Sequence, residues 1–164
     1  MIKIIDDFLP DYYFKSIHNT LLGSEFPWYY HTHVSYTDIE DDMFQFVYIF
    51  YADGTPTSNA QRFSLMEMCL QKLGVRNLYR IKANLNPRTF FHRKTGYHVD
   101  LENVGPHQTA VYYVNSNNGY TEFKKGGKVK SVANRMVIFD SKLEHQGVTS
   151  TDQKARVVIN FNYV

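Results

Sequence analysis

The sequence has a single cysteine, little excess charge and no long apolar run, and each of these absences removes a class of protein. Cys69 has no partner for an internal disulfide, which excludes a disulfide-stapled secreted fold. The net charge of +2, from 18 basic and 16 acidic residues, is too small to indicate a nucleic-acid partner. The longest mainly apolar stretch, Phe44–Ala52, is too short for a transmembrane helix, and the acidic start at Asp6 does not suit a signal peptide. We therefore expect a cytoplasmic protein without a membrane partner.

Aromatic residues are abundant by contrast. Tyrosine and phenylalanine make up most of the 16% aromatic content, and 43% of the chain is hydrophobic, which is enough for a packed core. Aromatic side chains suit the half-buried surface of a β-sheet. With 164 residues, we expect one domain across residues 1–164, present as a monomer or a weak homodimer.

Two segments have the apolar spacing of helices, and several others alternate as strands do. The first helix is expected at Asp11–Leu22, and the second from a capping box at Ser58-x-x-Gln61 to Gly74. The expected strands are 2–5, 78–86, 109–115, 121–125, 128–132, 135–140 and 156–163. Short strands at this spacing predict a mainly β, jelly-roll fold whose helices pack on one sheet.

Two of these strands carry polar residues on one side and apolar residues on the other. The polar sides are Arg80, Lys82, Asn84 and Asn86 in the earlier strand, and Arg156, Asn160 and Asn162 in the last strand. A solvent-facing sheet would explain one such strand. Two of them, one of which carries Arg156, favour a polar cavity inside a sandwich whose outer face is covered by the helices.

The second half of the chain contains a metal-ligand pattern. In the step His98-Val99-Asp100, the two polar side chains share one face if the segment is an extended strand. A second histidine, His145, would complete a set of two imidazoles and one carboxylate, which leaves three positions free and is typical of non-haem Fe(II) oxygenases. Arg156 supplies a fixed positive charge for a dicarboxylate co-substrate. The predicted catalytic residues and metal ligands are therefore His98, Asp100 and His145.

From about Asn84 to its end, the sequence resembles the 2-oxoglutarate and Fe(II)-dependent dioxygenases, particularly their prolyl-4-hydroxylase-like branch. The segments that carry the resemblance are Gly96–Asp100, Thr109–Asn115, Gly119–Phe123, His145–Val148 and Ala155–Phe161. The resemblance implies a double-stranded β-helix (jelly-roll, cupin-like) core and an iron-binding hydroxylase that consumes 2-oxoglutarate and O2 and releases succinate and CO2. It also implies that Arg156, together with Tyr113, binds the distal carboxylate of 2-oxoglutarate.

Four further residues are expected near the co-substrate. Thr109 and Val111 share a face with Tyr113, so they line the cavity if that tyrosine points into it. Relatives often have a tyrosine before the turn at Pro87, where this chain has Asn86. We expect Asn84 or Asn86 to supply the missing hydrogen bond.

Three alternatives stay open. A nucleobase-oxidising relative would carry a further arginine soon after Arg156, and residues 157–164 contain none. A non-catalytic cupin-type metal- or sugar-binding sandwich, or a hydrolytic zinc site on the same ligands, would leave Arg156 without a role. The prime substrate is expected to be peptidyl proline, a free amino acid or another small metabolite, with the segments 30–42 and 88–97 as its walls.

Overall fold

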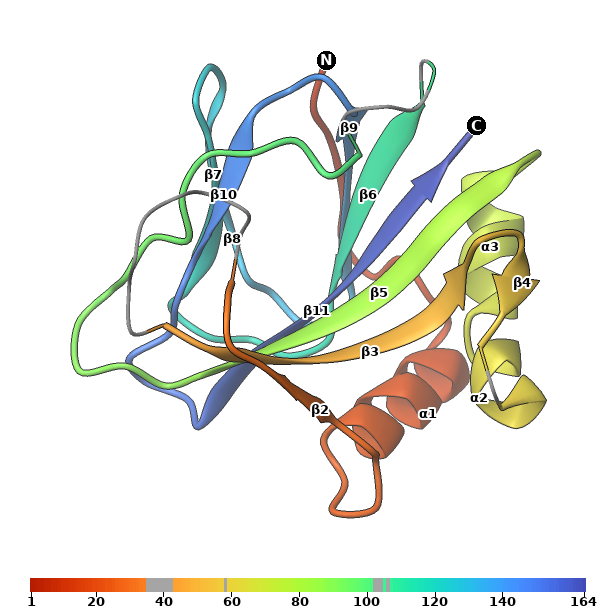
Figure 1. Cartoon of the computed structure of the whole chain (residues 1–164), viewed down its shortest axis with the longest axis horizontal. Helices are drawn as coiled ribbons and strands as arrows, with labels where there is room; N and C mark the ends of the chain where they lie inside the picture. Colours follow the sequence, from red (N-terminus) through yellow and green to blue (C-terminus); the bar gives the residue numbers. More distant parts are fainter. Residues whose placement is uncertain (35–42, 58, 102–104, 106) are drawn as a thin grey trace.

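The structure, a computed structural model, describes residues 1–34, 43–57, 59–101, 105 and 107–164. Within these residues the chain forms two antiparallel sheets and three helices (Figure 1). The larger sheet has the order β1-β9-β6-β11-β5-β3-β2, with β4 paired to β3, and the smaller has the order β10-β7-β8. The strands are β1 (Lys3–Ile5), β2 (Tyr29–His31), β3 (Gln45–Ala52), β4 (Thr55–Pro56), β5 (Leu78–Pro87), β6 (Gln108–Tyr113), β7 (Tyr120–Phe123), β8 (Gly127–Lys130), β9 (Arg135–Asp140), β10 (His145–Val148) and β11 (Ala155–Tyr163).

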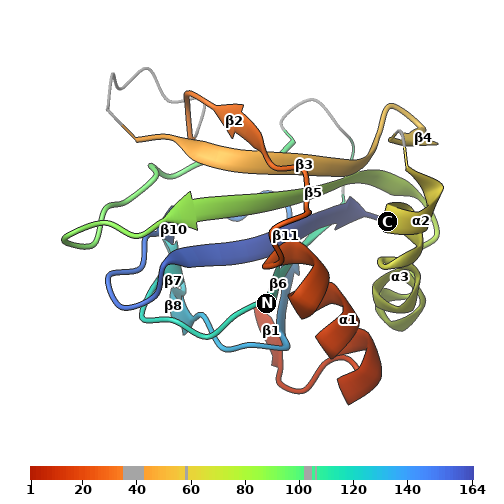
Figure 2. The ribbon, with the colours of Figure 1, turned by 90° about the horizontal axis from the view of Figure 1, so that it is seen from below.

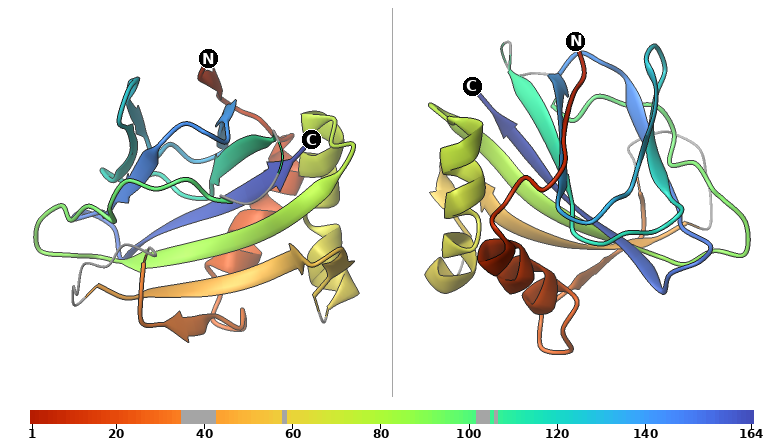
Figure 3. Two further views of the ribbon diagram at one scale, coloured as in Figure 1. Left: turned by 45° about the horizontal axis from the view of Figure 1, so that its top comes forward. Right: turned by 180° about the vertical axis from the view of Figure 1, so that it is seen from behind.

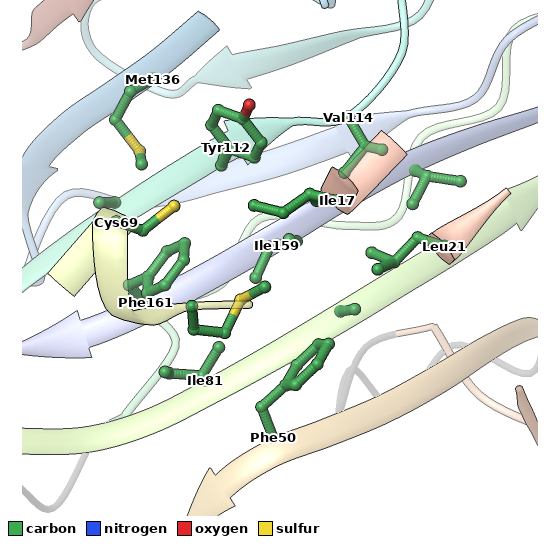
Figure 4. Packing of buried hydrophobic residues seen from close by; sticks show 14 of the residues in the cluster. Ile17, Leu21, Phe50, Cys69, Ile81, Tyr112, Val114, Met136, Ile159 and Phe161 are labelled. Atoms are coloured by element: carbon green, nitrogen blue, oxygen red, sulfur yellow. The ribbon is translucent and has the colours of Figure 1, made fainter. Parts of the chain in front are cut away.

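The helices α1 (Asp11–Leu21), α2 (Ala60–Ser64) and α3 (Glu67–Leu73) cover one face of the larger sheet, and the smaller sheet lies over the opposite face (Figures 2 and 3). Ile17 and Leu21 of α1 and Cys69 of α3 are buried against the sheet residues Ile81 and Ile159 (Figure 4). This arrangement confirms the predicted sandwich with helices on one sheet. No helix in the described ranges is long and apolar enough to cross a membrane.

The second predicted helix is wrong in its start and its continuity. Asn59 caps α2, because its side-chain oxygen accepts a hydrogen bond from the backbone N–H of Arg62 at 3.0 Å. The proposed capping residue, Ser58, lies outside the described residues. The helix then breaks before Glu67, so that two short helices stand where one was expected. Its end is as predicted, since Gly74 adopts a left-handed conformation with φ +67°.

The inner face of the larger sheet is divided into an apolar end and a polar end. At the apolar end, the two sheets pack through Val111, Tyr113, Phe123, Val129, Val137, Phe139 and Val158. At the polar end, the pairing of β11 with β5 sets Arg156 beside Asn86 and Asn160 beside Lys82. The same alternation that buries Ile159 under the helices therefore turns its polar neighbours into the sandwich, as the sequence predicts.

Asn134 fastens the segment before α1 to the sheet. Its amide donates to the carbonyl of Leu9 at 2.8 Å, and its side-chain oxygen accepts from the N–H of Leu9 and from the hydroxyl of Tyr112, each at 2.9 Å. Asn134 is 7% exposed and has φ +62°, a conformation that asparagine tolerates better than most residues.

Replacement of Asn134 by alanine should lower the free energy of unfolding by about 2–4 kcal/mol, because three buried polar groups lose their partner. Asn134→Gly should lose less than alanine, since glycine accepts the positive φ. Asn19→Ala, at an exposed position of α1, is the control and should change stability by no more than about 0.5 kcal/mol. Equal losses in Asn134→Ala and Asn19→Ala on denaturant unfolding would contradict this role for Asn134.

Candidate metal centre

Backbone pairing brings the two predicted histidine ligands together. His98 and His145 form an isolated antiparallel bridge in which each backbone N–H donates to the other's carbonyl at 3.0 Å. His98 is not part of a regular strand, so the expectation of an H-x-D step on a strand is wrong. The outcome is the same, because one extended bridge pair is enough to set the two imidazoles side by side, with ring centroids 4.9 Å apart.

The ligand atoms of His98, Asp100 and His145 lie within 4.8 Å of one another. The carboxylate oxygen Oδ1 of Asp100 is 3.8 Å from Nε2 of His98 and 4.0 Å from Nε2 of His145. In each histidine the other ring nitrogen, Nδ1, already has a partner: the carbonyl of Gly96 at 3.0 Å or that of Leu143 at 3.1 Å. These bonds favour a proton on Nδ1. They leave Nε2 unprotonated and able to coordinate a metal, which is the arrangement that metal-binding histidines use.

Asp100 is a buried carboxylate surrounded by a guanidinium, two imidazoles and an amide. Its side chain is 4% exposed. Burial raises its pKa, but the attraction of His145, Arg80 and His98 and the hydrogen bond from Asn162 together hold the pKa below its usual value. The nearest nitrogen of Arg80 is 3.6 Å from Oδ1, and the amide of Asn162 donates to Oδ2 at 3.1 Å. Asp100 is therefore ionised and oriented without a metal.

His145 is held in the form that binds metals. Burial lowers its pKa, which the attraction of Asp100 offsets only in part, and His98 lowers it further. Its ring also packs edge-on against Phe139, with centroids 4.8 Å apart. A neutral imidazole of fixed orientation next to an ionised carboxylate matches the donor set that non-haem Fe(II) prefers.

Arg156 lies deep in the same cavity, at 3% exposure. Its Nε donates to the hydroxyl of Ser131 and its Nη2 to that of Thr121, each at 3.0 Å, and its guanidinium carbon lies 5.6 Å from the ring centre of Tyr113. Burial lowers the pKa of Arg156, but a guanidinium stays charged in proteins. Within the described residues no carboxylate pairs with this charge.

Glycine makes room for that arginine. A Cβ on Gly119 would lie 2.9 Å from Cδ of Arg156 and 2.7 Å from the carbonyl oxygen of Val148, which is too close for any other residue. Gly147 lies across from Nη1 of Arg156, where a Cβ would come within 3.6 Å. The position of the arginine thus depends on the absence of a side chain at Gly119, whereas a Cβ at Gly147 would make only ordinary van der Waals contact with it.

The other predicted co-substrate residues fall into two groups. Asn84, Asn86 and Val111 line the cavity. The amide nitrogen of Asn86 is buried and has no hydrogen-bond partner among the described residues. Tyr113 and Thr109 are on the inner face but are covered: the hydroxyl of Tyr113 donates to Thr121 at 2.7 Å, and Thr109 accepts from Asn162 at 3.1 Å.

Several cavity residues were missed by the sequence reasoning. Thr121 and Ser131 hold Arg156, and Asn162 and Arg80 hold Asp100. Asn162 and Arg80 belong to the polar sides of their strands, so the alternation pointed to them without a role. Ser131 gave no signal. Of the predicted substrate walls, Thr95 and Val34 reach the cavity, whereas Phe90 and Phe91 are exposed and 35–42 lie outside the described residues.

Comparison with solved structures identifies the fold. A prolyl-4-hydroxylase of Pseudomonas putida matches with a TM-score of 0.63 and 15% identity, over 99% of this chain and 91% of that one. A prolyl hydroxylase of Trichoplax adhaerens, in complex with a hypoxia-inducible-factor peptide fragment, matches at 0.62 and 16%, over 99% and 82%. The epimerase SnoN, in complex with Fe3+, alpha-ketoglutarate and nogalamycin RO, matches at 0.66 and 11%, over 99% and 78%.

The chain has the double-stranded β-helix fold. This confirms the predicted fold class and the kind of structure that the resemblance indicates. No protein-family model matches the sequence, and no curated protein matches it. At these identities the likeness concerns the fold, and the chemistry of the site has to be argued from this chain's own residues.

Asn162 gives a test of the centre that does not need activity. We expect Asn162→Ala to weaken the binding of a divalent metal about 10–100-fold, because Asp100 loses the bond that orients it. His145→Ala should weaken metal binding further, since it removes a metal ligand. His18→Ala, in α1 and outside the cavity, should bind metal as the wild type does. Titration calorimetry with Co(II) measures all three, and equal affinities across the set would contradict the assignment of the ligands.

Proposed function

We propose that the protein is an Fe(II)- and 2-oxoglutarate-dependent dioxygenase that hydroxylates a small-molecule or peptide substrate, with release of succinate and CO2. The observation that carries the proposal is the buried Arg156, which has no carboxylate partner among the described residues and lies in one cavity with His98, Asp100 and His145. A metal site alone fits several chemistries. A buried guanidinium at the end of the same cavity adds a place for the distal carboxylate of a dicarboxylic acid.

The residues present fit both groups. The two imidazoles and one carboxylate are the donor set of a non-haem Fe(II) centre with free positions. The amide of Asn86, which has no partner in the described part of the chain and is the cross-strand neighbour of Arg156, is a second donor for a carboxylate and stands where relatives often have a tyrosine. When bound, the iron and 2-oxoglutarate would supply the oxidising chemistry through oxidative decarboxylation.

The chain's own part is to bind, orient and keep water away. Arg156 fixes one end of the co-substrate, and because Ser131 and Thr121 hold the guanidinium, it is already in place before binding. Arg80 and Asn162 keep Asp100 ionised for the metal. Because Asp100 fills the carboxylate position, no place is left at that point for a halide, and hydroxylation follows as the proposed outcome.

The alternatives explain less of the cavity. A zinc hydrolase and a non-catalytic cupin-type protein would use the metal ligands but leave two groups without a function: the buried, charged Arg156 and the Asn86 amide, which no described residue contacts by a hydrogen bond. A nucleobase oxygenase is disfavoured by the small net charge of +2 and by the absence of arginine after Arg156. We therefore propose a small acid, an amino acid or a peptide as the substrate class.

Arg156→Ala should raise the concentration of 2-oxoglutarate needed for half-maximal succinate formation by at least about thirtyfold, because a buried carboxylate loses its charged partner. The 2-oxoglutarate concentration that Arg156→Lys needs should lie between those of the wild type and Arg156→Ala. Lysine keeps the positive charge but loses the planar, two-pronged geometry of the guanidinium. Arg76→Ala, at an exposed position, is the matched control.

Iron-dependent formation of succinate from 2-oxoglutarate, with and without a substrate mixture, is the measurement. Lack of any iron-dependent succinate from the wild type would refute the proposed function. An Arg156→Ala requirement equal to that of Arg76→Ala would show that another residue binds the co-substrate.

A further inference from the structure

Lys82 is a cation that lines the cavity and has no direct partner among the described residues. It lies in the middle of β5 and lines the same cavity as the predicted metal ligands. In the described part of the chain its ammonium makes neither a hydrogen bond nor an ion pair. Burial and the positive charge of Arg80 lower the pKa of Lys82, and the attraction of Asp100 opposes this in part. A half-buried ammonium without a direct ion-pair partner in the described residues is costly, which points to a missing anion.

The two arginines that line the cavity, Arg80 and Arg156, have partners for their charges or their N–H groups. Arg80 pairs with Asp100 and donates from Nε to the side-chain oxygen of Asn162 at 3.2 Å. Arg156 has two hydroxyl partners and, under the proposed function, the distal carboxylate of 2-oxoglutarate. Asp100 cannot serve Lys82 as well, because it is shared between Arg80 and the metal position. Among the residues that the structure describes, the positive charge of Lys82 is therefore in excess even when the co-substrate is counted.

Asn160, the neighbour of Lys82, also has a side-chain atom that lacks a hydrogen-bond partner among the described residues. Asn160 of β11 is the direct cross-strand partner of Lys82 and lines the same cavity. The side-chain oxygen of Asn160 is buried without a hydrogen-bond donor in the described residues. Strand alternation turns both side chains into the sandwich, so a cation and a free acceptor lie next to each other in the cavity. A ligand that carries an anionic group with a hydrogen-bond donor beside it would satisfy both.

We propose that the prime substrate carries a carboxylate or phosphate group that pairs with Lys82. This inference rests on the proposed function, in that it places the oxidised molecule between Lys82 and the metal ligands. It favours a small acid, such as a free amino acid with its ammonium on Asn160, over the neutral ring of a peptidyl proline. An uncharged prolyl side chain would leave both Lys82 and Asn160 unsatisfied.

The test uses acetate as the anionic probe and acetamide as its neutral match. The protein is loaded with Mn(II) and saturated with 2-oxoglutarate, so that Arg156 is occupied, and each probe is titrated while paramagnetic broadening of its 13C-methyl signal is followed. We expect saturable broadening for acetate and none for acetamide. Lys82→Met should weaken the acetate effect at least about tenfold. Lys82→Arg should restore it, and Lys130→Met, at an exposed lysine outside the cavity, should leave it unchanged.

Two further arms identify the source of the anion and separate the two proposals. Methyl phosphate that binds more tightly than acetate indicates a phosphate substrate, and the reverse order indicates a carboxylate. Equal broadening by acetate and acetamide, or broadening that Lys82→Met leaves unchanged, would overturn the role of Lys82 even if 2-oxoglutarate binds. Failure of 2-oxoglutarate to bind, with the Lys82-dependent acetate effect retained, would overturn the proposed function and leave the anion site standing.

Discussion

The structure of the cavity depends on one buried carboxylate, that of Asp100. A carboxylate inside a β-sandwich stays ionised only if positive charge and hydrogen bonds replace water. Arg80 and Asn162 provide both from neighbouring strands, and the two imidazoles of His98 and His145 lie within reach of the same oxygen. The polar side chains of β5 and β11 thus keep the metal-binding carboxylate ionised, and they also form a surface for ligands.

The fold keeps these polar side chains separate from the main core. In β5 and β11 alternate side chains go to opposite faces, so Ile81 and Ile159 join the core under the helices while Lys82 and Asn160 face the cavity. Apolar packing between the sheets runs mainly through β6, β7 and β9, which leaves the polar side chains of β5 and β11 free to face ligands. A shift of one residue in the pairing of these two strands would exchange the faces and destroy both regions.

Much of this could be predicted from sequence, because it depends on local alternation. Seven strands (β1, β5, β6, β7, β8, β9 and β11), the covering helices and the polar sides of β5 and β11 follow from period and composition, whereas β2, β3, β4 and β10 were not predicted. The contacts of Arg156 with Ser131 and Thr121 could not be predicted, since they join strands of different sheets. The cap at Asn59 was missed because Ser58 fits the same local pattern. The bridge between His98 and His145 is likewise a long-range pairing, which no local rule locates.

The central claim is that one cavity holds both a metal, on His98, Asp100 and His145, and the dicarboxylate, on Arg156. Anaerobic addition of Fe(II) and then 2-oxoglutarate to the protein measures this directly by visible absorption. We expect a weak charge-transfer band that needs both additions, because the 2-keto acid would have to chelate the same iron that the three side chains bind. Absence of the band at saturating concentrations of both, with the protein folded, would contradict this claim.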